Sequence, residues 1–384
     1  MMTDVWKIAA AKPRGVLNYL NGKIWVPVNG FQSHLIEELH LTGVKDNAIT
    51  VIENGVEHTG STGFTRHTEP VPRSERLVYC EGIRDEVFWK QVCWEAPFVA
   101  GFGSIGEAAE ILRGIQRNWA HYPVSCFRRA ELIGTKLPYI GKKEKPFPYT
   151  VPLAGMGIWS LLDEHTLLAS AKTSSPFPLG SIRFAENHQD PPSRAYLKLW
   201  EALSLLDFYY RRDAETGNLS AAAVSAGYPL PKRGSRCIDA GACPGGWTWV
   251  LDSLGAEVIA IDRSPLADSL MGRPHITFIR HDAFTLSPEE LGKQDWIFSD
   301  VICYPPRLLE WIERWLASGL CDQFVCTIKM QGTPDFDTIR RFAHIPHSKI
   351  VHLVANKHEL TWLHAPFIRA EGLIPRRLRR NEGY

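Results

Sequence analysis

The sequence lacks the cysteine patterns of a metal site or a disulfide framework. Its eight cysteines include no Cys-x-x-Cys pair, and none has a histidine beside it at the spacing typical of zinc ligands. This distribution favours reduced thiols, as in a cytoplasmic protein, and gives no reason to expect a metal ion.

The chain also lacks a long uncharged apolar run. A membrane-spanning helix needs about 18 or more such residues, and no stretch approaches that length. The opening residues, MMTDVWKIAAAKPRG, contain no apolar core long enough for a secretion signal. We therefore expect neither a membrane span nor secretion.

Neither sign of charge is in excess, because 43 Lys and Arg residues against 42 Asp and Glu residues give a formal net charge of +1. A nucleic-acid partner would therefore have to be bound through local basic patches. With 384 residues and 45% hydrophobic content, the chain can bury a large core, and its length predicts two domains.

What the sequence does contain is a glycine-rich stretch, Arg236–Asp262, which reads RCIDAGACPGGWTWVLDSLGAEVIAID. Two apolar runs flank a glycine turn and an amphipathic segment, which predicts a strand, a loop, a helix and a second strand. This is the first half of a nucleotide-type α/β fold. Gly241, Gly245 and Gly246 allow close approach to a ligand, and a helix that begins near Trp247 offers unpaired N–H groups there.

The ligand is predicted from the glycine spacing and from two acids. Gly-x-x-x-Gly-Gly differs from the dinucleotide pattern Gly-x-Gly-x-x-Gly, so a pyrophosphate is not favoured. Asp239 suits a cationic amino-acid end and Asp262 suits a ribose diol, which together describe S-adenosylmethionine. A tight glycine turn without a ligand is the simpler alternative, but two acids at strand ends favour the ligand.

The alternation of strands and helices continues along the chain. Ser193 is a good N-cap for a helix that runs through Leu203. The further strands are expected at 276–281, 295–300, 323–329, 349–354 and 362–365, with helices at 308–317 and 336–344. Because acids or a lysine stand at successive strand ends, we expect one ligand-binding rim at the carboxyl edge of an open sheet.

Residues 1–175 are expected to form a smaller α+β domain without a catalytic signature, and residues 185–384 to form the α/β domain. Ser104–Ala120 has the apolar spacing of one amphipathic helix, and Ile158–Lys172 alternates apolar and polar residues as a strand does. Short strands are also expected at Val78 and Phe98–Val99.

Two basic clusters are candidates for RNA binding, the first of them interleaved with aromatic residues. They are Arg128, Arg129, Lys136, Lys142, Lys143 and Lys145, and then, in the tail, Arg369, Arg376, Arg377, Arg379 and Arg380. Cations neutralise phosphates while aromatic rings stack on unpaired bases. A merely solvated loop is an equally open interpretation of the first cluster.

From about Ser174 to Pro366 the chain resembles the FtsJ-like ribose 2′-O-methyltransferases, in particular the bacterial family that methylates a cytidine of large-subunit (23S-type) rRNA. The resemblance rests on the motifs SSPFPLGSIRF, SRAYLKLWEA, DAGACPGGWTW and DWIFSD, and on the strand that ends in Lys329. It implies a Rossmann-like class I methyltransferase domain with a mostly parallel sheet, preceded by a THUMP-type, ferredoxin-like domain that binds RNA.

The same resemblance implies S-adenosylmethionine as the cofactor, RNA as the partner and no metal. The matching catalytic residues are Lys198, Asp300, Lys329 and Glu359. The matching cofactor-binding residues are Ser193, Asp239, Gly241, Cys243, Pro244, Gly245, Gly246, Trp247, Asp262, Asp282 and Asp300. Asp262 is expected on the ribose hydroxyls and Asp282 on the adenine amino group, since a carboxylate accepts from both donors.

Two segments depart from the family pattern. After the fourth strand the family has Asp-x-x-x-x-Lys-Pro where this chain has DVICYPPR, and the basic run after the second catalytic lysine is replaced by MQGTPD. Both segments belong to the expected RNA entrance, so the target nucleotide is left open.

The residue types also suggest how methyl transfer would proceed. A ribose 2′-hydroxyl is a poor nucleophile, so the reaction needs a base beside it. A second ammonium group and partial burial favour the neutral amine of a lysine, which makes Lys329 the candidate base. Lys198 would favour that state and donate to the hydroxyl oxygen, and Asp300 would orient Lys329. Glu359 would position Lys198 or limit the accumulated positive charge.

Two other functions stay open. Tyr304-Pro305-Pro306 is similar to a motif of base N-methyltransferases, although its order is reversed and Asp300 stands ahead of it. A catalytically inactive RNA-binding or ribosome-assembly factor could keep the same fold. The presence of all four catalytic residue types argues against the inactive factor, and their placement at element ends argues against ordinary surface ion pairs.

Overall fold

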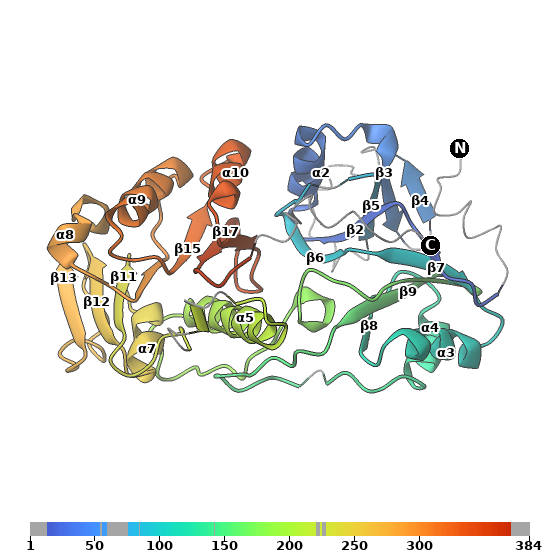
Figure 1. The fold of residues 1–384 in the computed structure, drawn as a ribbon, viewed down its shortest axis with the longest axis horizontal. Helices are drawn as coiled ribbons and strands as arrows, with labels where there is room; N and C mark the ends of the chain where they lie inside the picture. Colours follow the sequence, from blue (N-terminus) through green and yellow to red (C-terminus); the bar gives the residue numbers. More distant parts are fainter. Residues whose placement is uncertain are drawn as a thin grey trace. The chain divides into compact units, whose positions relative to one another are not determined.

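The structure is a computed structural model that describes residues 14–53, 56–59, 76–83, 85–141, 143–219, 223–224 and 228–369. The chain divides into two compact units (Figure 1). The first consists of Met1–Asp190, Trp200–Phe208 and Val351–Leu360. The second consists of Pro191–Leu199, Tyr209–Ile350 and Thr361–Tyr384.

The first unit has both sheets and helices, as expected. One five-stranded sheet has the order β1-β7-β10-β9-β8 and the other has the order β4-β3-β5-β2-β6. The first sheet consists of β1 Asn18–Tyr19, β7 Pro97–Gly101, β8 Trp119–His121, β9 Gly157–Asp163 and β10 Thr166–Ser170. The second consists of β2 Gly22–Pro27, β3 Ile49–Glu53, β4 Val56–Thr59, β5 Arg76–Glu81 and β6 Lys90–Trp94. The helices are α2 Gln32–Leu41, α3 Ile105–Ile115 and α4 Phe127–Gly134.

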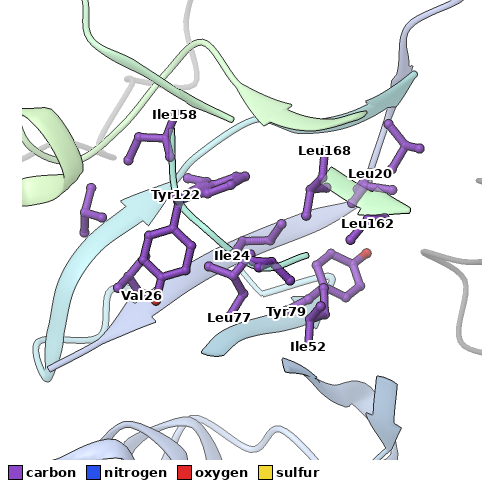
Figure 2. Close-up of a cluster of buried hydrophobic side chains, with 14 residues drawn as sticks. Leu20, Ile24, Val26, Ile52, Leu77, Tyr79, Tyr122, Ile158, Leu162 and Leu168 are labelled. Atoms are coloured by element: carbon purple, nitrogen blue, oxygen red, sulfur yellow. The ribbon is translucent and has the colours of Figure 1, made fainter. Parts of the chain in front are cut away.

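A core of buried apolar side chains joins these two sheets (Figure 2). Ile24 of β2 and Leu77 of β5 come from one sheet and Leu168 of β10 from the other. The residues on either side of Leu168 in β10, Leu167 and Ala169, point to the opposite face of the sheet and pack in a second cluster with α3 and α4. The sheet that contains β10 is therefore buried on both faces, which explains the continuous apolar composition of its strands.

The helix predicted over Ser104–Ala120 is correct at its start and wrong at its end. The Ser104 side chain caps α3 by accepting a hydrogen bond from Glu107 N at 3.2 Å. The helix ends at Ile115, and Trp119 begins strand β8, where it pairs with Gly157 of β9. The indole N–H of Trp119 donates to Leu112 O at 2.8 Å, so a side chain that fits the helical apolar pattern packs back on the helix from a strand.

The stretch predicted to alternate as a strand, Ile158–Lys172, contains two strands instead. A turn at residues 164–165 separates β9 from β10, and the two strands pair in antiparallel fashion. Even the polar positions Ser160 and Ser170 are fully buried. Burial of both faces, rather than of one, explains why the pattern does not give a clean alternation.

The second unit is built around a seven-stranded sheet of order β13-β12-β11-β14-β15-β17-β16 (Figure 1). Its strands are β11 Arg236–Ala240, β12 Glu257–Asp262, β13 Ile276–Arg280, β14 Trp296–Ser299, β15 Phe324–Lys329, β16 Ser348–Val351 and β17 Glu359–His364. The pairs β13–β12, β12–β11, β11–β14 and β14–β15 are parallel. The predicted Rossmann-like fold with a mostly parallel sheet is thus confirmed for this part of the chain.

Helices cover both faces of this sheet (Figure 1). They are α7 Gly246–Ser253, α8 Pro288–Leu291, α9 Pro305–Ser318 and α10 Phe336–His344. In Figure 1, α9 and α10 lie on one face and α7 on the other. Strand β11 is central, with β12 on one side and β14 on the other, so the strand order reverses beside the turn that follows β11. Such a reversal opens a ligand crevice at the carboxyl ends of the strands.

The helix predicted to start at Ser193 begins later. Helix α5 spans Tyr196–Glu215, its N-cap is Ala195, and no side chain caps it. Ser193 is therefore not the cap, and its hydroxyl lies against the backbone of Gly246 instead. None of the helices in the described part of the chain, α5 included, is long and apolar enough to cross a membrane.

A buried carboxyl group on α5 links stability to pH. The Glu201 residue is 3% exposed, and its Oε2 accepts a hydrogen bond from Val354 N at 2.9 Å. Burial disfavours the ionised form and raises the pKa of Glu201 to about 8, although the bond from Val354 acts in the opposite direction.

We expect Glu201→Gln to change how stability depends on pH. In the unfolded chain this glutamate ionises near 4.5, so its contribution to stability is complete below that pH and is lost as the pH rises towards about 8. Glutamine keeps the acceptor for Val354 N and cannot ionise. The variant should therefore gain melting temperature relative to wild type as the pH rises from about 5 to 8. Thermal unfolding of both proteins tests this, and a difference that stays constant with pH would contradict it.

Candidate active site

The turn between β11 and α7 requires glycine at two positions. Gly241 has a φ of +78°, and a Cβ added there would lie 2.2 Å from Val301 Cγ2. Gly245 has a φ of +113°, and its Cβ would lie 2.3 Å from Leu270 Cδ1. Side chains are disfavoured at both positions by conformation and by space. Glycine at these two positions therefore lets the side chains of Val301 and Leu270 pack directly against the backbone of the turn.

The start of α7 packs against the segment that precedes α5. A Cβ on Gly246 would lie 2.5 Å from Ser193 Oγ, so only glycine allows this approach. The indole Nε1 of Trp247 donates to Ala195 O at 2.8 Å. The Lys198 ammonium lies 6.0 Å from the centre of the Trp247 ring. These contacts hold α7 and the beginning of α5 together beside the glycine turn.

Asp262, the last residue of β12, stabilises the glycine turn. Its Oδ2 accepts from Cys243 N at 3.0 Å, and its Oδ1 accepts from Ser264 N at 2.9 Å. Asp262 is partly exposed, and Cys243, followed by Pro244, is exposed. Each carboxylate oxygen has a second lone pair, so Asp262 can accept further hydrogen bonds from a ligand.

Asp239 lies beneath the same turn and is fully buried. Its Oδ2 accepts from Thr248 Oγ1 at 2.6 Å, whereas Oδ1 has no hydrogen-bond partner within the described residues. Burial is the main reason that the pKa of Asp239 is raised to about 7. Thr248 could not be identified as a partner of Asp239 from the sequence, because a threonine in the first turns of a helix is ordinary.

These features fit the adenosine and amino-acid ends of S-adenosylmethionine. Cys243 and Pro244 are the exposed residues of the turn, and Asp262 beside them offers acceptors for hydroxyl groups. Asp239 keeps one unused acceptor, the complement of an ammonium donor. The predicted residues Gly241, Gly245 and Asp262 are therefore brought together at one edge of the sheet.

Two lysines contact one aspartate at this edge. The Lys198 Nζ donates to both carboxylate oxygens of Asp300, each at 2.7 Å. Lys329 Nζ donates to the main-chain oxygen of Asp300 at 2.6 Å and lies 3.1 Å from Asp300 Oδ1. The side chains of Lys198, Asp300 and Lys329 are only 8%, 16% and 18% exposed. Two ammonium groups and one carboxylate thus form a mostly buried cluster.

The sheet explains why this cluster forms. Asp300 directly follows β14, and Lys329 is the last residue of the neighbouring parallel strand β15. Parallel neighbours place their carboxyl ends at the same edge. Lys198 comes from the first turn of α5, far away in sequence. The predicted proximity of these three residues is therefore present in the structure.

Glu359 is the first residue of β17, the strand that adjoins β15 in the sheet order. It is 8% exposed. By its contacts it belongs to the first unit, together with the segment Val351–Leu360.

Asp282, two residues beyond β13, is held by two arginines that the sequence did not reveal. Its Oδ2 pairs with Arg307 at 2.9 Å and also with Arg263, and its Oδ1 accepts from Phe284 N at 3.1 Å. Partial burial by itself would raise the pKa of Asp282, but the hydrogen bonds from Phe284, Arg307 and Arg263 outweigh it and lower the pKa. Asp282 is thus an ionised acceptor with two cations beside it.

The basic residues of the first unit differ in their surroundings. Arg128 and Lys143 are exposed, as is Lys136. Arg129 lies over the Phe102 ring at 5.5 Å, and Lys145 lies over the Tyr149 ring at 5.4 Å. Of the tail, only Arg369 is described, and it donates to Asn218 O. Lys142, Arg376, Arg377, Arg379 and Arg380 lie outside the described residues.

Comparison with known proteins relates this geometry to a family. The model of the FtsJ-like methyltransferase family matches residues 192–360. Over 163 residues the chain is 33% identical to the ribosomal RNA large subunit methyltransferase M of Alkalilimnicola ehrlichii, a match that covers 42% of this chain and 40% of that protein. Over 236 residues it is 30% identical to the protein of the same name from Xanthomonas axonopodis pv. citri, which covers 61% and 59%. The match thus spans less than two thirds of either relative.

Among solved structures, the fibrillarin pre-rRNA processing protein of Methanococcus jannaschii is 22% identical. It covers 35% of this chain and 67% of that chain with a TM-score of 0.30, which is too weak a likeness to support an argument. The family match coincides with the sheet that has the glycine turn, and it includes Lys198, Asp300 and Lys329. Residues 192–360 are therefore similar to the FtsJ-like methyltransferase family.

Proposed function

We propose that this protein transfers a methyl group from S-adenosylmethionine to a ribose 2′-hydroxyl of RNA, and that its substrate is large-subunit rRNA, with a cytidine as the target. The observation that carries the proposal is the cluster of Lys198, Asp300 and Lys329 beside the glycine turn. The names of the two relatives support the choice of rRNA.

In this proposal Lys329 is the general base. A lysine side chain has three N–H donors, and two of them are directed to Asp300, one to its main-chain oxygen and one to Oδ1. The third position is left for an incoming hydroxyl. Asp300 therefore fixes the direction in which the neutral amine would present its lone pair to the ribose.

Lys198 and Glu359 have supporting roles. The ammonium group of Lys198 donates to both carboxylate oxygens of Asp300 at 2.7 Å and would hold that carboxylate in place beside Lys329. Lys198 would also donate to the ribose oxygen. Glu359 would position Lys198 or balance its charge. When bound, S-adenosylmethionine supplies a methyl group on a sulfonium, so the proposal needs no metal ion.

The first unit would hold the RNA, as a THUMP-like module does. Its exposed cations Arg128 and Lys143 support this role, and so does the exposed Tyr139 between them in sequence. Arg129 and Lys145 are already engaged with aromatic rings of the protein. We therefore assign phosphate contacts first to Arg128 and Lys143.

The experiment that tests the function is a map of 2′-O-methyl groups in total RNA from cells with and without the protein. Ribose 2′-O-methylation blocks alkaline cleavage at the modified nucleotide, so a single lost block in large-subunit rRNA supports the proposal. Loss of a base methyl group with unchanged alkaline cleavage would indicate a base N-methyltransferase. The proposal is rejected if two results agree. No methyl group is lost from the RNA of cells without the protein, and purified protein incubated with rRNA and S-adenosylmethionine gives no methylated product.

Variants of Lys329 distinguish a general base from a residue that only binds the substrate. Lys329→Ala should lower the single-turnover rate by about 10² or more while S-adenosylmethionine still binds. Lys329→Arg should be nearly as damaging, because guanidinium does not release its proton at working pH. The wild-type rate should rise with pH between about 6 and 9, since only the neutral amine accepts a proton. An arginine variant with the wild-type rate would show that the position supplies only positive charge.

The second prediction concerns the cofactor. Asp262→Asn keeps one acceptor for the turn but removes the negative charge, so S-adenosylmethionine should bind more weakly by about 1 to 3 kcal/mol. The matched control is Asp268→Asn, an exposed residue close by in the chain. Calorimetry on both variants measures the change. Equal affinity of the Asp262 variant and wild type would remove Asp262 from the cofactor site.

The third prediction concerns RNA. Removing Arg128 and Lys143 together should weaken RNA binding and reduce the slope of log affinity against log salt by about 1 to 2, because one or two phosphate contacts are lost. A double variant of the exposed Lys45 and Arg233 removes the same charge elsewhere and should leave the slope unchanged. Filter binding at several salt concentrations gives both slopes. Identical slopes for the two double variants would show that Arg128 and Lys143 do not contact RNA phosphates.

A further inference from the structure

The segment between β14 and α9 has two exposed apolar side chains. Ile302 is 78% exposed and Tyr304 is 65% exposed, whereas Cys303 between them is 7% exposed. The segment directly follows Asp300, which contacts both lysines. Single exposed apolar residues are common on protein surfaces, whereas apolar residues exposed together can mark a binding site.

Both ends of the segment are fixed. At its start, Val301 packs so closely on the glycine turn that a Cβ on Gly241 would lie 2.2 Å from Val301 Cγ2. At its end, Tyr304 is the N-cap of α9, and Pro305 and Pro306 occupy the first helical turn. Proline at these positions has the backbone angle that the helix needs. Tyr304 is therefore presented on a stiff support, which reduces the entropy lost when it binds a partner.

Positive charge lies one helical turn away. Arg307 contacts Asp282 at 2.9 Å and lies over the Phe284 ring at 5.1 Å, and its side chain is still 50% exposed. Asp282 also pairs with Arg263, whose side chain is 74% exposed. Both guanidinium groups share the one carboxylate of Asp282, so each keeps N–H donors for a phosphate, and Glu310, Glu313 and Arg314 line the same pocket as Arg307.

We propose that Tyr304, supported by Ile302, is a stacking platform for an unpaired RNA base next to the target nucleotide. An aromatic ring stacks on any base, and a nearby arginine can contact the adjoining phosphate. A nucleotide whose ribose reaches Lys329 has neighbours that pass close to the residues following Asp300. Two side chains are too small a surface for a stable protein–protein contact, which favours RNA over a protein partner.

This inference rests on the proposed function, because it names the part of that site which receives the substrate. Its test uses the full chain and two measurements: the affinity for a fluorescent single-stranded RNA of mixed sequence, and the KM and kcat for methylation of an rRNA transcript. Tyr304→Ala should weaken RNA binding and raise the KM by about 5- to 100-fold, the effect of losing one stacked base. The kcat and the affinity for S-adenosylmethionine should stay near those of wild type.

Conservative variants and a matched control sharpen the test. Tyr304→Phe and Tyr304→Trp keep a ring and should bind RNA as wild type does, whereas Ile302→Ala should have a smaller effect than Tyr304→Ala. Tyr19→Ala removes an equally exposed tyrosine, 62% exposed, from β1 in the first unit and should change neither measurement. Melting temperatures of all variants exclude a loss of folding.

The possible results are distinct. Weak binding by Tyr304→Ala with rescue by phenylalanine supports the platform. Unchanged RNA affinity in Tyr304→Ala overturns it, and so does an equal loss in Tyr304→Phe, because the hydroxyl and not the ring would then be responsible. If wild type binds RNA through Tyr304 but methylates none, the proposed activity fails while the platform stands. If wild type binds no RNA, both fail.

Discussion

The contact between the Lys198 ammonium and both oxygens of Asp300 is the interaction on which the candidate site depends. Three ionic side chains are mostly buried here, and burying a charge without a partner costs several kcal/mol. Asp300 satisfies both lysines at once, one by its carboxylate and the other also by its main-chain oxygen. Without Asp300, two ammonium groups would face one another in the same small space.

The rest of the unit places Asp300 where this is possible. Ser299 of β14 pairs with Cys326 of β15, so Asp300 and Lys329 leave the sheet at the same edge. On the other side of β14, the glycine turn after β11 packs against Val301. One short segment therefore contacts the lysines, supports the cofactor turn and leads into the exposed Tyr304. A change in the position of this segment would affect the glycine turn, the two lysines and Tyr304 together.

The first unit has a different physical organisation. One cluster of its apolar side chains joins two sheets (Figure 2). Another packs with α3 and α4, and the strands are accordingly rich in large apolar residues. Some of its cations are held over aromatic rings within the unit, which leaves fewer of them for phosphates than the sequence alone indicated.

The sequence by itself determined the α/β fold of the second unit and the ends of β12 and β15, whereas the strand predicted over 349–354 ends at Val351 and the one predicted over 362–365 is Glu359–His364. The local pattern of residues predicts these features without knowledge of tertiary contacts. They are the apolar runs that end in Asp262 and Lys329 and the glycine turn after Asp239. Only the tertiary structure decided which partners these groups have. Ser193 lies against Gly246 instead of capping a helix, Trp119 leaves a helical pattern for a strand, and Asp282 is held by Arg263 and Arg307. Such contacts join residues that are distant in sequence. The spacing of apolar residues within one segment does not indicate which distant residue will contact it.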